Sequence, residues 1–274
     1  MRPSNPAQGG EASLSFQNAR FAYEPRKIVV QDFTARLSPG ELCALIGPNA
    51  AGKSTLLRLA MGQLTPTSGT VTLDGVEVCS LKPRQRAKWI SYVPQRPAAG
   101  FAFTVEQVVA MGRFALPANW PAVDRAMQSC DLAGHHGRVY THLSAGQQQR
   151  VVLARSLAQS AGSGRIMLLD EPGSAMDLWH VHHTMRLLRE RSSQGLAVLV
   201  VLHDLNLAAA YADVVWLMDS GRLMAAGPWE DVLRPQVLEP VYRIALRAEA
   251  YDSRGRPLFR ADPEATLLGG TSSK

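Results

Sequence analysis

Cysteine and long apolar runs are what this chain of 274 residues has least of. Its three cysteines, Cys43, Cys79 and Cys130, form no CxxC pair and no even set. This excludes a disulfide-stapled secreted fold and favours a reducing compartment. The longest aliphatic run, residues 196–202, is far shorter than the ~20 apolar residues that cross a bilayer. If the chain acts at a membrane, we therefore expect it to bind there through partner proteins.

The excess of positive over negative charge is also modest. Charged residues make up 19% of the chain, the formal net charge is +6, and lysines and arginines are scattered. This argues against a nucleic-acid partner and is typical of an ordinary basic surface. The alternative interpretation of the positive charge is a weak attraction to phosphate or lipid headgroups. Hydrophobic residues, at 46%, are enough for one large core or for a core with a smaller lobe.

The two ends are poor in apolar residues. The start, MRPSNPAQGG, lacks the apolar segment of a signal peptide, and the final LLGGTSSK is typical of a loose tail. We expect a disordered leader at 1–11, the main domain at 12–245, and a C-terminal extension and tail at 246–274.

The apolar pattern between these ends alternates between strands and helices. Strands are expected at 14–23, 28–37, 41–46, 70–73, 89–93, 166–169 and 197–202. Helices are expected at 53–61, 105–113, 122–132, 145–157 and 178–191. Strands interrupted by helices predict an α/β fold with parallel strands. The helical block at about 97–160 predicts an inserted lobe rather than a separate domain.

The clearest motif is a glycine-rich loop between a short apolar strand and a helix. Its residues match GxxxxGK[ST] and are Gly47, Pro48, Asn49, Ala50, Ala51, Gly52, Lys53 and Ser54, with Thr55 following. Backbone N–H groups of such a loop surround a phosphate, and the helix N-terminus favours negative charge. Lys53 would reach the β and γ phosphates, and the Ser54 hydroxyl would bind Mg²⁺. Alone, the motif leaves kinases, GTPases and ATPases open.

A later apolar strand ends in two carboxylates. Asp170 is expected at the C-terminal edge of a parallel strand, where ligands bind, and would hold Mg²⁺ through water. Glu171 would point the other way by strand alternation, and so could orient or deprotonate an attacking water. Acidic residues also occur at ordinary strand exits, so this interpretation depends on the loop at Gly47.

Residues 143–150, LSAGQQQR, resemble the signature motif of the ABC ATPases, LSGGQ followed by QR. Ser144 and the Gly146 backbone would lie at a helix N-terminus, which attracts anions, and Gln147 completes the motif. A plain N-cap by Ser144 is the alternative. In the ABC family this motif completes the nucleotide pocket of the opposite subunit.

Further resemblances follow in the family's order. Tyr23 resembles the aromatic residue that stacks on adenine. Gln95, in YVPQ, resembles the glutamine that contacts Mg²⁺ and faces the membrane partner. Residues 174–177, SAMD, resemble the D-loop that crosses the dimer interface, and His203 resembles the histidine that contacts the γ-phosphate. Over about 14–227 the chain is identified as a member of the ABC ATPase family.

This resemblance implies a P-loop NTPase of the α/β class with a mixed sheet core, an N-terminal antiparallel β subdomain and an inserted helical subdomain. It also implies ATP and Mg²⁺ as cofactors, with Ser54, Gln95 and Asp170 at the metal and Glu171 and His203 as catalytic residues. The implied assembly is a homodimer at the cytoplasmic face of the cell membrane. It would bind two permease subunits and act indirectly with a substrate-binding protein.

Three strings resemble one group of importers. They are TVEQVVAMGRF at 104–114, HDLNLA at 203–208 and LWHVHHTMRLL at 178–188. They are similar to ATPases that drive uptake of iron complexes, with hemin favoured, then a ferric siderophore or cobalamin. The alternatives are a soluble ABC ATPase with a non-transport role, an exporter and a P-loop kinase. His180, His182 and His183 also raise the hypothesis of direct metal or heme-iron binding, against ordinary solvated histidines.

Four residues depart from the family pattern, and two of them, Gly173 and Met176, alter the D-loop. Ala50 replaces a glycine, and at a positive φ it would cost about 1 kcal/mol. Ala145 replaces the first glycine of the signature motif. None of the four changes removes a catalytic side chain, so we expect them to affect how tightly the ATP-bound dimer closes.

Overall fold

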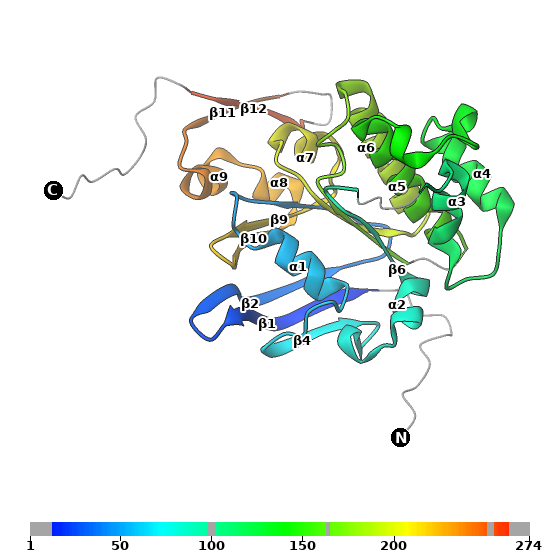
Figure 1. Cartoon of the computed structure of the whole chain (residues 1–274). Helices are drawn as coiled ribbons and strands as arrows, with labels where there is room; N and C mark the ends of the chain where they lie inside the picture. Colours follow the sequence, from blue (N-terminus) through cyan, green and yellow to red (C-terminus); the bar gives the residue numbers. More distant parts are fainter. Residues whose placement is uncertain (1–12, 98–101, 163–164, 251–254, 263–274) are drawn as a thin grey trace.

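A central sheet with a second sheet on one side and a group of helices on the other organises the chain (Figure 1). The computed structural model describes residues 13–97, 102–162, 165–250 and 255–262. The leader expected at 1–11 and the last part of the expected tail, 263–274, lie outside the described residues.

The central sheet has six strands in the order β10-β9-β3-β8-β7-β6. These strands are β3 (Leu42–Ile46), β6 (Ile90–Val93), β7 (Ile166–Asp170), β8 (Ala197–Val201), β9 (Val214–Asp219) and β10 (Arg222–Pro228). Neighbours from β9 to β6 run parallel, and β10 joins β9 antiparallel, so the sheet is mixed as expected. Ser220 and Gly221, with φ of 48° and 81°, make the β9–β10 turn, because two left-handed residues suit a tight hairpin.

Alternation along the parallel strands divides the core into two halves. In β3, the side chains of Leu42, Ala44 and Ile46 enter one cluster and those of Cys43 and Leu45 enter the other. The first cluster packs against the helices, and the second packs against α1 and the other sheet. Both faces are therefore covered, which explains why the central strands are apolar throughout.

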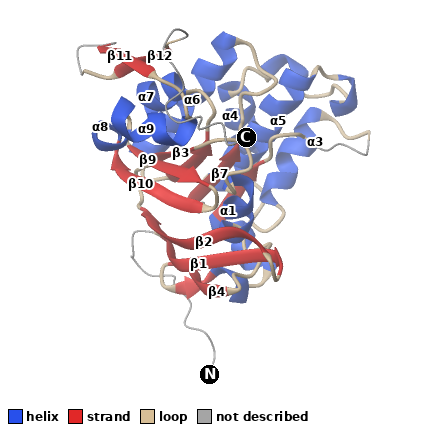
Figure 2. Cartoon of the chain, turned by 90° about the vertical axis from the view of Figure 1, so that its left-hand side faces the viewer, coloured by secondary structure: helices blue, strands red, loops and turns tan. Residues whose placement is uncertain are grey.

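The second sheet is antiparallel, in the order β2-β1-β4-β5. Its strands are β1 (Leu14–Glu24), β2 (Lys27–Leu37), β4 (Ser68–Leu73) and β5 (Val76–Glu77), and helix α1 spans Lys53–Ala60. Phe16 and Phe33 meet Trp216 of β9 edge to face, at centroid distances of 6.0 and 5.7 Å. These rings join the two sheets, and the expected N-terminal antiparallel subdomain is confirmed (Figure 2).

A helical lobe lies beside the β6 end of the central sheet (Figure 1). It holds α3 (Val105–Ala110), α4 (Trp120–Ser129), α5 (Ala145–Ser160) and short 3₁₀ turns at Met111–Arg113, Ala133–His135 and Tyr140–His142; α2 (Pro83–Trp89) precedes β6. The helix expected at 122–132 begins and ends earlier. Asn119 caps its first turn by accepting from the Ala122 N–H, and Asp131, with a φ of 54°, ends the helical path.

The C-terminal part adds four helices and a hairpin. They are α6 (Leu178–Ser193), α7 (Leu205–Tyr211), α8 (Trp229–Val232), α9 (Pro235–Tyr242) and the pair β11 (Leu246–Ala250) and β12 (Pro257–Ala261). Asn206 of α7 makes two hydrogen bonds with the Phe259 backbone, at 2.7 and 3.2 Å. The Arg256 guanidinium is buried over the Trp229 ring and donates to the Ala212 carbonyl at 3.2 Å. These contacts fix the hairpin on α7.

In the part of the chain that the structure describes, none of the helices combines the length and the apolar character that crossing a membrane requires.

Candidate nucleotide-binding site

The glycine-rich loop connects β3 to α1, and its shape depends on two glycines. Gly47 has a φ of 146°, and a Cβ there would lie 2.1 Å from the Met218 carbonyl oxygen. Gly52, with a φ of 100°, is the N-cap of α1 and would also clash with a neighbouring carbonyl. Ala50 has a φ of 62°, so it adopts the left-handed backbone that glycine tolerates best. The strain expected at Ala50 is therefore present.

Lys53 begins α1 and is almost fully buried. Its ammonium donates to the carbonyls of Gly47 and Pro48, both at 2.8 Å. Burial lowers the pKa of Lys53, while the nearby carboxylates of Glu171 and Asp170 oppose that shift. The amine and the two acidic residues thus share one electrostatic environment, at the start of a helix.

Asp170, the last residue of β7, is 6% exposed. Burial raises the pKa of this carboxyl, and a hydrogen bond from the Ser54 side chain opposes the shift. Its Oδ1 atom has no hydrogen-bond partner among the described residues. A buried carboxylate oxygen without a partner beside a hydroxyl group is the arrangement that a hard cation would complete, so these two residues fit Mg²⁺.

Glu171 lies just past the end of β7 and links two other strand ends. Its Oε2 accepts a hydrogen bond from Nε2 of Gln95 at 2.6 Å, and its Oε1 contacts Nε2 of His203. The side chains of Glu171 and Asp170 have different partners, since Asp170 is hydrogen-bonded by Ser54. Glu171 has a φ of 49°, so its backbone is left-handed and the alternation of a continuing strand does not apply to it.

Tyr23 ends its strand close to α1. Its hydroxyl lies 3.4 Å from Oγ1 of Thr55 and accepts a hydrogen bond from Arg58 at 3.3 Å. The rings of Tyr23 and Phe21 form a T-shaped pair, and Tyr23 is 48% exposed, so its side chain is accessible to a ligand. Sequence reasoning missed Arg58, whose charge also lowers the pKa of Asp170. Its position four residues after Ser54, on the same helix face, was the available signal.

The signature motif lies elsewhere in the chain, at the start of α5. Ser144 accepts from the Gln147 N–H at 3.3 Å, and the Gln147 side chain accepts from the Ser144 N–H at 3.0 Å. This reciprocal capping box confirms the expected N-cap. Ala145, the first residue of α5, is not among the positive-φ residues of the described chain, so this departure from the family pattern brings no backbone strain.

A hollow of about 530 Å³ lies between the signature motif and the D-loop. It is lined by Ser144, Ala145, Gly146, Gln147, Arg150, Ala175, Met176, Asp177 and His180. A Cβ at Gly146 would lie 2.7 Å from the Ala175 carbonyl oxygen, so the two segments are in close contact. The phosphate loop contributes no residue to this lining among the described residues. The two motifs therefore form separate surfaces of one chain.

The three histidines of α6 contact three separate partners. His180 Nδ1 lies 2.8 Å from Asp177, His182 Nδ1 lies 2.9 Å from the Tyr211 hydroxyl, and His183 Nε2 lies 2.8 Å from the Ser129 carbonyl. Their ring nitrogens do not converge on a common position. The geometry thus favours local packing roles over a shared metal or heme-iron site.

Together, these groups can perform phosphoryl-transfer chemistry. The loop N–H groups and Lys53 can bind a polyphosphate, and Ser54 with Asp170 can hold a divalent cation. Glu171, held by an amide and an imidazole, can orient and deprotonate a water molecule.

Comparison with known proteins agrees with this geometry. A family model described as ABC transporter matches residues 30–174. The chain is 43% identical over 242 residues to the "Hemin import ATP-binding protein HmuV" of Pseudomonas fluorescens (strain Pf0-1), covering 86% of this chain and 95% of that protein. It is 40% identical over 248 residues to the protein of the same name from Rhizobium meliloti (strain 1021), covering 87% and 94%.

Solved structures share the architecture. One belongs to a metal-chelate type ABC transporter in an inward-facing conformation, with a TM-score of 0.76 and 27% identity over 92% of this chain and 98% of that one. Residues 30–174, which the family model matches, include the glycine-rich loop, the signature motif and both strand-end carboxylates. By family match, sequence identity and fold, the chain belongs to the ABC transporter family, as one of its ATP-binding subunits.

Proposed function

We propose that this chain hydrolyses ATP to energise the uptake of hemin through a separate permease. The observation that carries the catalytic part is the convergence of Gln95, Glu171 and His203 at three strand ends beside the phosphate loop. The substrate part rests on relatives named for hemin import at 40–43% identity over most of both chains.

The proposed chemistry assigns a role to each group of the site. Gly47 to Thr55 bind the phosphates, and the exposed side chain of Tyr23 stacks on adenine. Ser54 and Asp170 hold Mg²⁺, which neutralises phosphate charge when bound. The side-chain amide N–H of Gln95 donates a hydrogen bond to Glu171, which leaves the amide oxygen as the atom that can bind Mg²⁺.

We further propose that two copies act together. Ser144 and the Gly146 backbone form a helix N-terminus that faces a hollow, yet they lie outside the phosphate loop of their own chain. Such an N-terminus is suited to a phosphate brought by a second copy. Hydrolysis should then require two chains, so specific ATPase activity should rise steeply with protein concentration. A specific activity independent of concentration would contradict the paired site.

The proposed docking surface for the permease is a groove of about 490 Å³ beside β6 and the helical lobe. Its lining includes Met111 and Phe114, whose side chains are 40% and 67% exposed. Exposed apolar side chains beside a groove are typical of protein interfaces. In the proposed assembly the chain is a peripheral subunit on the cytoplasmic face of the membrane, and a substrate-binding protein acts on the other side.

Transport in proteoliposomes tests the proposal. The chain is reconstituted with a candidate permease from the same organism, and uptake of hemin, cobalamin and a ferric siderophore is measured with ATP supplied on the side that carries the ATPase. Hemin uptake that is lost with Glu171→Gln would support the function. ATP-dependent uptake of cobalamin or of the ferric siderophore in place of hemin would show that the proposed substrate is wrong. An ATPase that is active but binds no permease would favour the soluble alternative.

A further inference from the structure

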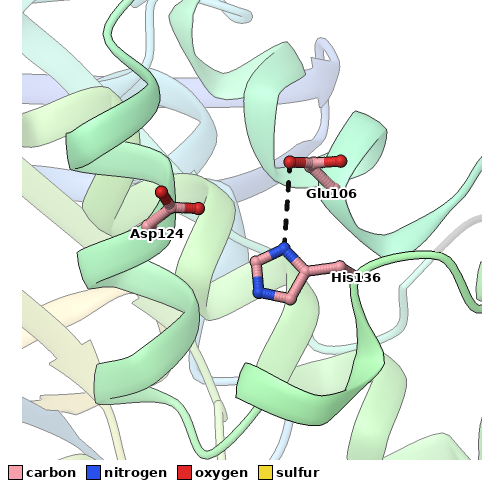
Figure 3. A group of neighbouring side chains, drawn as sticks. All are labelled: Glu106, Asp124 and His136. Carbon is pink, nitrogen blue, oxygen red and sulfur yellow. Dashed lines mark ion pairs between the residues drawn. The ribbon is translucent and has the colours of Figure 1, made fainter.

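Three side chains that the nucleotide site does not use converge in the helical lobe, and we propose that they bind a divalent transition-metal ion such as Zn²⁺. They are Glu106 of α3, Asp124 of α4 and His136, which follows the turn Ala133–His135. One ligand atom from each lies within 4.8 Å of the other two. Figure 3 shows the three side chains pointing from separate segments into one space. All three residues are half-buried, so water only partly screens them.

The donor set determines the class of ion. Two carboxylates and one imidazole match the oxygen and nitrogen ligands of Zn²⁺, whereas Mg²⁺ and Ca²⁺ select oxygen ligands. Among divalent metals, imidazole-containing sites bind Zn²⁺ more tightly than Mn²⁺ or Fe²⁺. With three protein ligands, a tetrahedral ion keeps one position for water.

The ligand atoms are spaced more widely than hydrogen-bonded atoms, and this spacing leaves room for an ion between them. Nδ1 of His136 lies 3.8 Å from Oε1 of Glu106, which is longer than a hydrogen bond. Two ligands bound to one Zn²⁺ at about 2.0–2.1 Å lie roughly 3.3 Å apart in a tetrahedron. For this pair a closer approach of about 0.5 Å gives the bound spacing, and ligand atoms up to 4.8 Å apart must approach by up to about 1.5 Å. Changes of side-chain rotamer can supply movements of this size.

The backbone holds two of the ligand residues in place. The Val105 N–H donates to the Arg138 carbonyl at 2.9 Å, and the Glu106 N–H donates to the His136 carbonyl at 3.3 Å. The segment that carries His136 is thus tied to the first turn of α3. Rigid support of this kind is what distinguishes a formed site from side chains that happen to be near each other.

Asp124 is held by the packing of its own helix. Its neighbours Val123 and Met127 are buried in the same cluster as Val105, so α4 cannot turn its acidic residue away without breaking that core. The helix dipole favours an acid at Glu106 but does not explain why a second carboxylate faces it. Two carboxylates this close repel each other, and a cation would relieve that repulsion.

The position of the site relates it to the signature motif. His135, the residue before the imidazole ligand, has its Nε2 3.4 Å from Nε2 of Gln147. Gln147 in turn closes the capping box with Ser144. A bound ion would therefore restrain the segment that contacts the start of α5. It would act as a structural ion of the helical lobe, independent of the nucleotide and its Mg²⁺.

Zn²⁺ titration of the full-length, nucleotide-free chain by calorimetry tests the proposal. We compare the wild-type chain with Glu106→Gln, Asp124→Asn and His136→Ala, and with His142→Ala as the control, since it removes an exposed histidine of the same lobe. Each triad variant should lose one equivalent of Zn²⁺ or bind it at least about tenfold more weakly. The control should bind as the wild type does.

Thermal unfolding gives an independent readout. Free Zn²⁺ about a hundredfold above Kd should raise the wild-type Tm by about 5 °C, and should not raise that of the triad variants. Co²⁺ should give visible absorption bands that His136→Ala abolishes. Equal Zn²⁺ uptake by the wild type and all folded triad variants would overturn the proposal, as would an equal loss in His142→Ala. Glu106→Gln and Asp124→Asn are nearly isosteric, and His136→Ala removes a half-exposed ring. If one variant does not fold, Zn²⁺ binding by the other two still tests the proposal.

Discussion

The side chains of Glu171 and His203 are hydrogen-bonded, Oε1 of the carboxylate to Nε2 of the imidazole, across 32 residues of sequence. They follow β7 and β8, which are adjacent parallel strands. The second carboxylate oxygen is held by Gln95. Glu171 is thus fixed from both sides, and a fixed carboxylate at a strand end is suited to orienting one water molecule.

Glu171→Gln should therefore retain ATP binding and lose turnover by about a hundredfold or more. The amide keeps the size of the side chain but cannot accept a proton. Phosphate release and nucleotide binding by calorimetry measure the two effects separately. Glu230→Gln, an exposed change on α8, should leave both intact. A Glu171→Gln variant that hydrolyses ATP normally would show that another group is the base.

Ala50→Gly should stabilise the nucleotide-free protein. The left-handed backbone costs alanine about 1–2 kcal/mol, and glycine relieves this strain. Glycine also makes the unfolded chain more flexible, which destabilises the folded protein by about 0.4–1 kcal/mol. The net gain in unfolding free energy should be about 0.5–1 kcal/mol, measured by urea denaturation. Ala51→Gly is the matched control. Ala51 is buried without a positive φ, so its change should destabilise the protein by about 1–2 kcal/mol. Equal losses in both variants would contradict the strain at Ala50.

Asp170→Asn should raise the stability of the nucleotide-free protein near neutral pH while abolishing Mg²⁺-dependent turnover. The raised pKa of Asp170 means that the folded protein keeps this proton to a higher pH than the unfolded chain does. The folded state therefore loses stability as the pH rises from the ordinary value of 3.8 through the raised pKa. Asparagine avoids this loss because it does not ionise.

The difference in Tm between Asp170→Asn and the wild type should shrink as the pH falls toward 3.8, where the wild-type carboxyl is protonated in both states. Scanning calorimetry over this range measures it. Asp231→Asn, at an exposed carboxylate, should show no comparable gain near neutral pH. A constant difference at every pH would mean that ionisation of Asp170 is not the cause.

Asn206→Ala should release the C-terminal hairpin from α7. The side chain makes both hydrogen bonds to the Phe259 backbone, and their loss in a partly buried place should cost about 1–3 kcal/mol. Hydrogen exchange should show lost protection at the Phe259 amide. Asn119→Ala removes an N-cap in the helical lobe and should cost about 1 kcal/mol without changing exchange at Phe259. Unchanged protection of Phe259 in Asn206→Ala would show that other contacts hold the hairpin.

The buried strands and the phosphate loop were predictable from the sequence for a physical reason. Strands covered on both faces, such as β7 and β8, appear as continuous apolar runs. The phosphate loop is contiguous, so its residues and their roles are encoded within a few positions. Ser144 was predictable as an N-cap because capping is equally local.

The elements that were not expected are held by their partners rather than by local preference. β10, RLMAAGP, is an edge strand whose residues are only half-buried or exposed, so pairing with β9 decides its conformation. The LRAEA of β11 has good helix formers, and pairing with β12 overrides them. Likewise, the left-handed backbone of Glu171 is unfavourable for its residue type, and alternation rules cannot anticipate it.

A methyl group does not fit between Gly146 and the Ala175 carbonyl, so the start of α5 and the loop after β7 are in steric contact. The same loop is also bonded to Glu171, because the Ser174 N–H donates to the Glu171 backbone carbonyl at 3.2 Å. A displacement of the start of α5 would therefore press on the Ala175 carbonyl, which lies one residue from the backbone hydrogen bond between Ser174 and Glu171. Under the proposed pairing of two copies, a nucleotide bound at the start of α5 would thus lie one short loop away from the proposed base of the same chain.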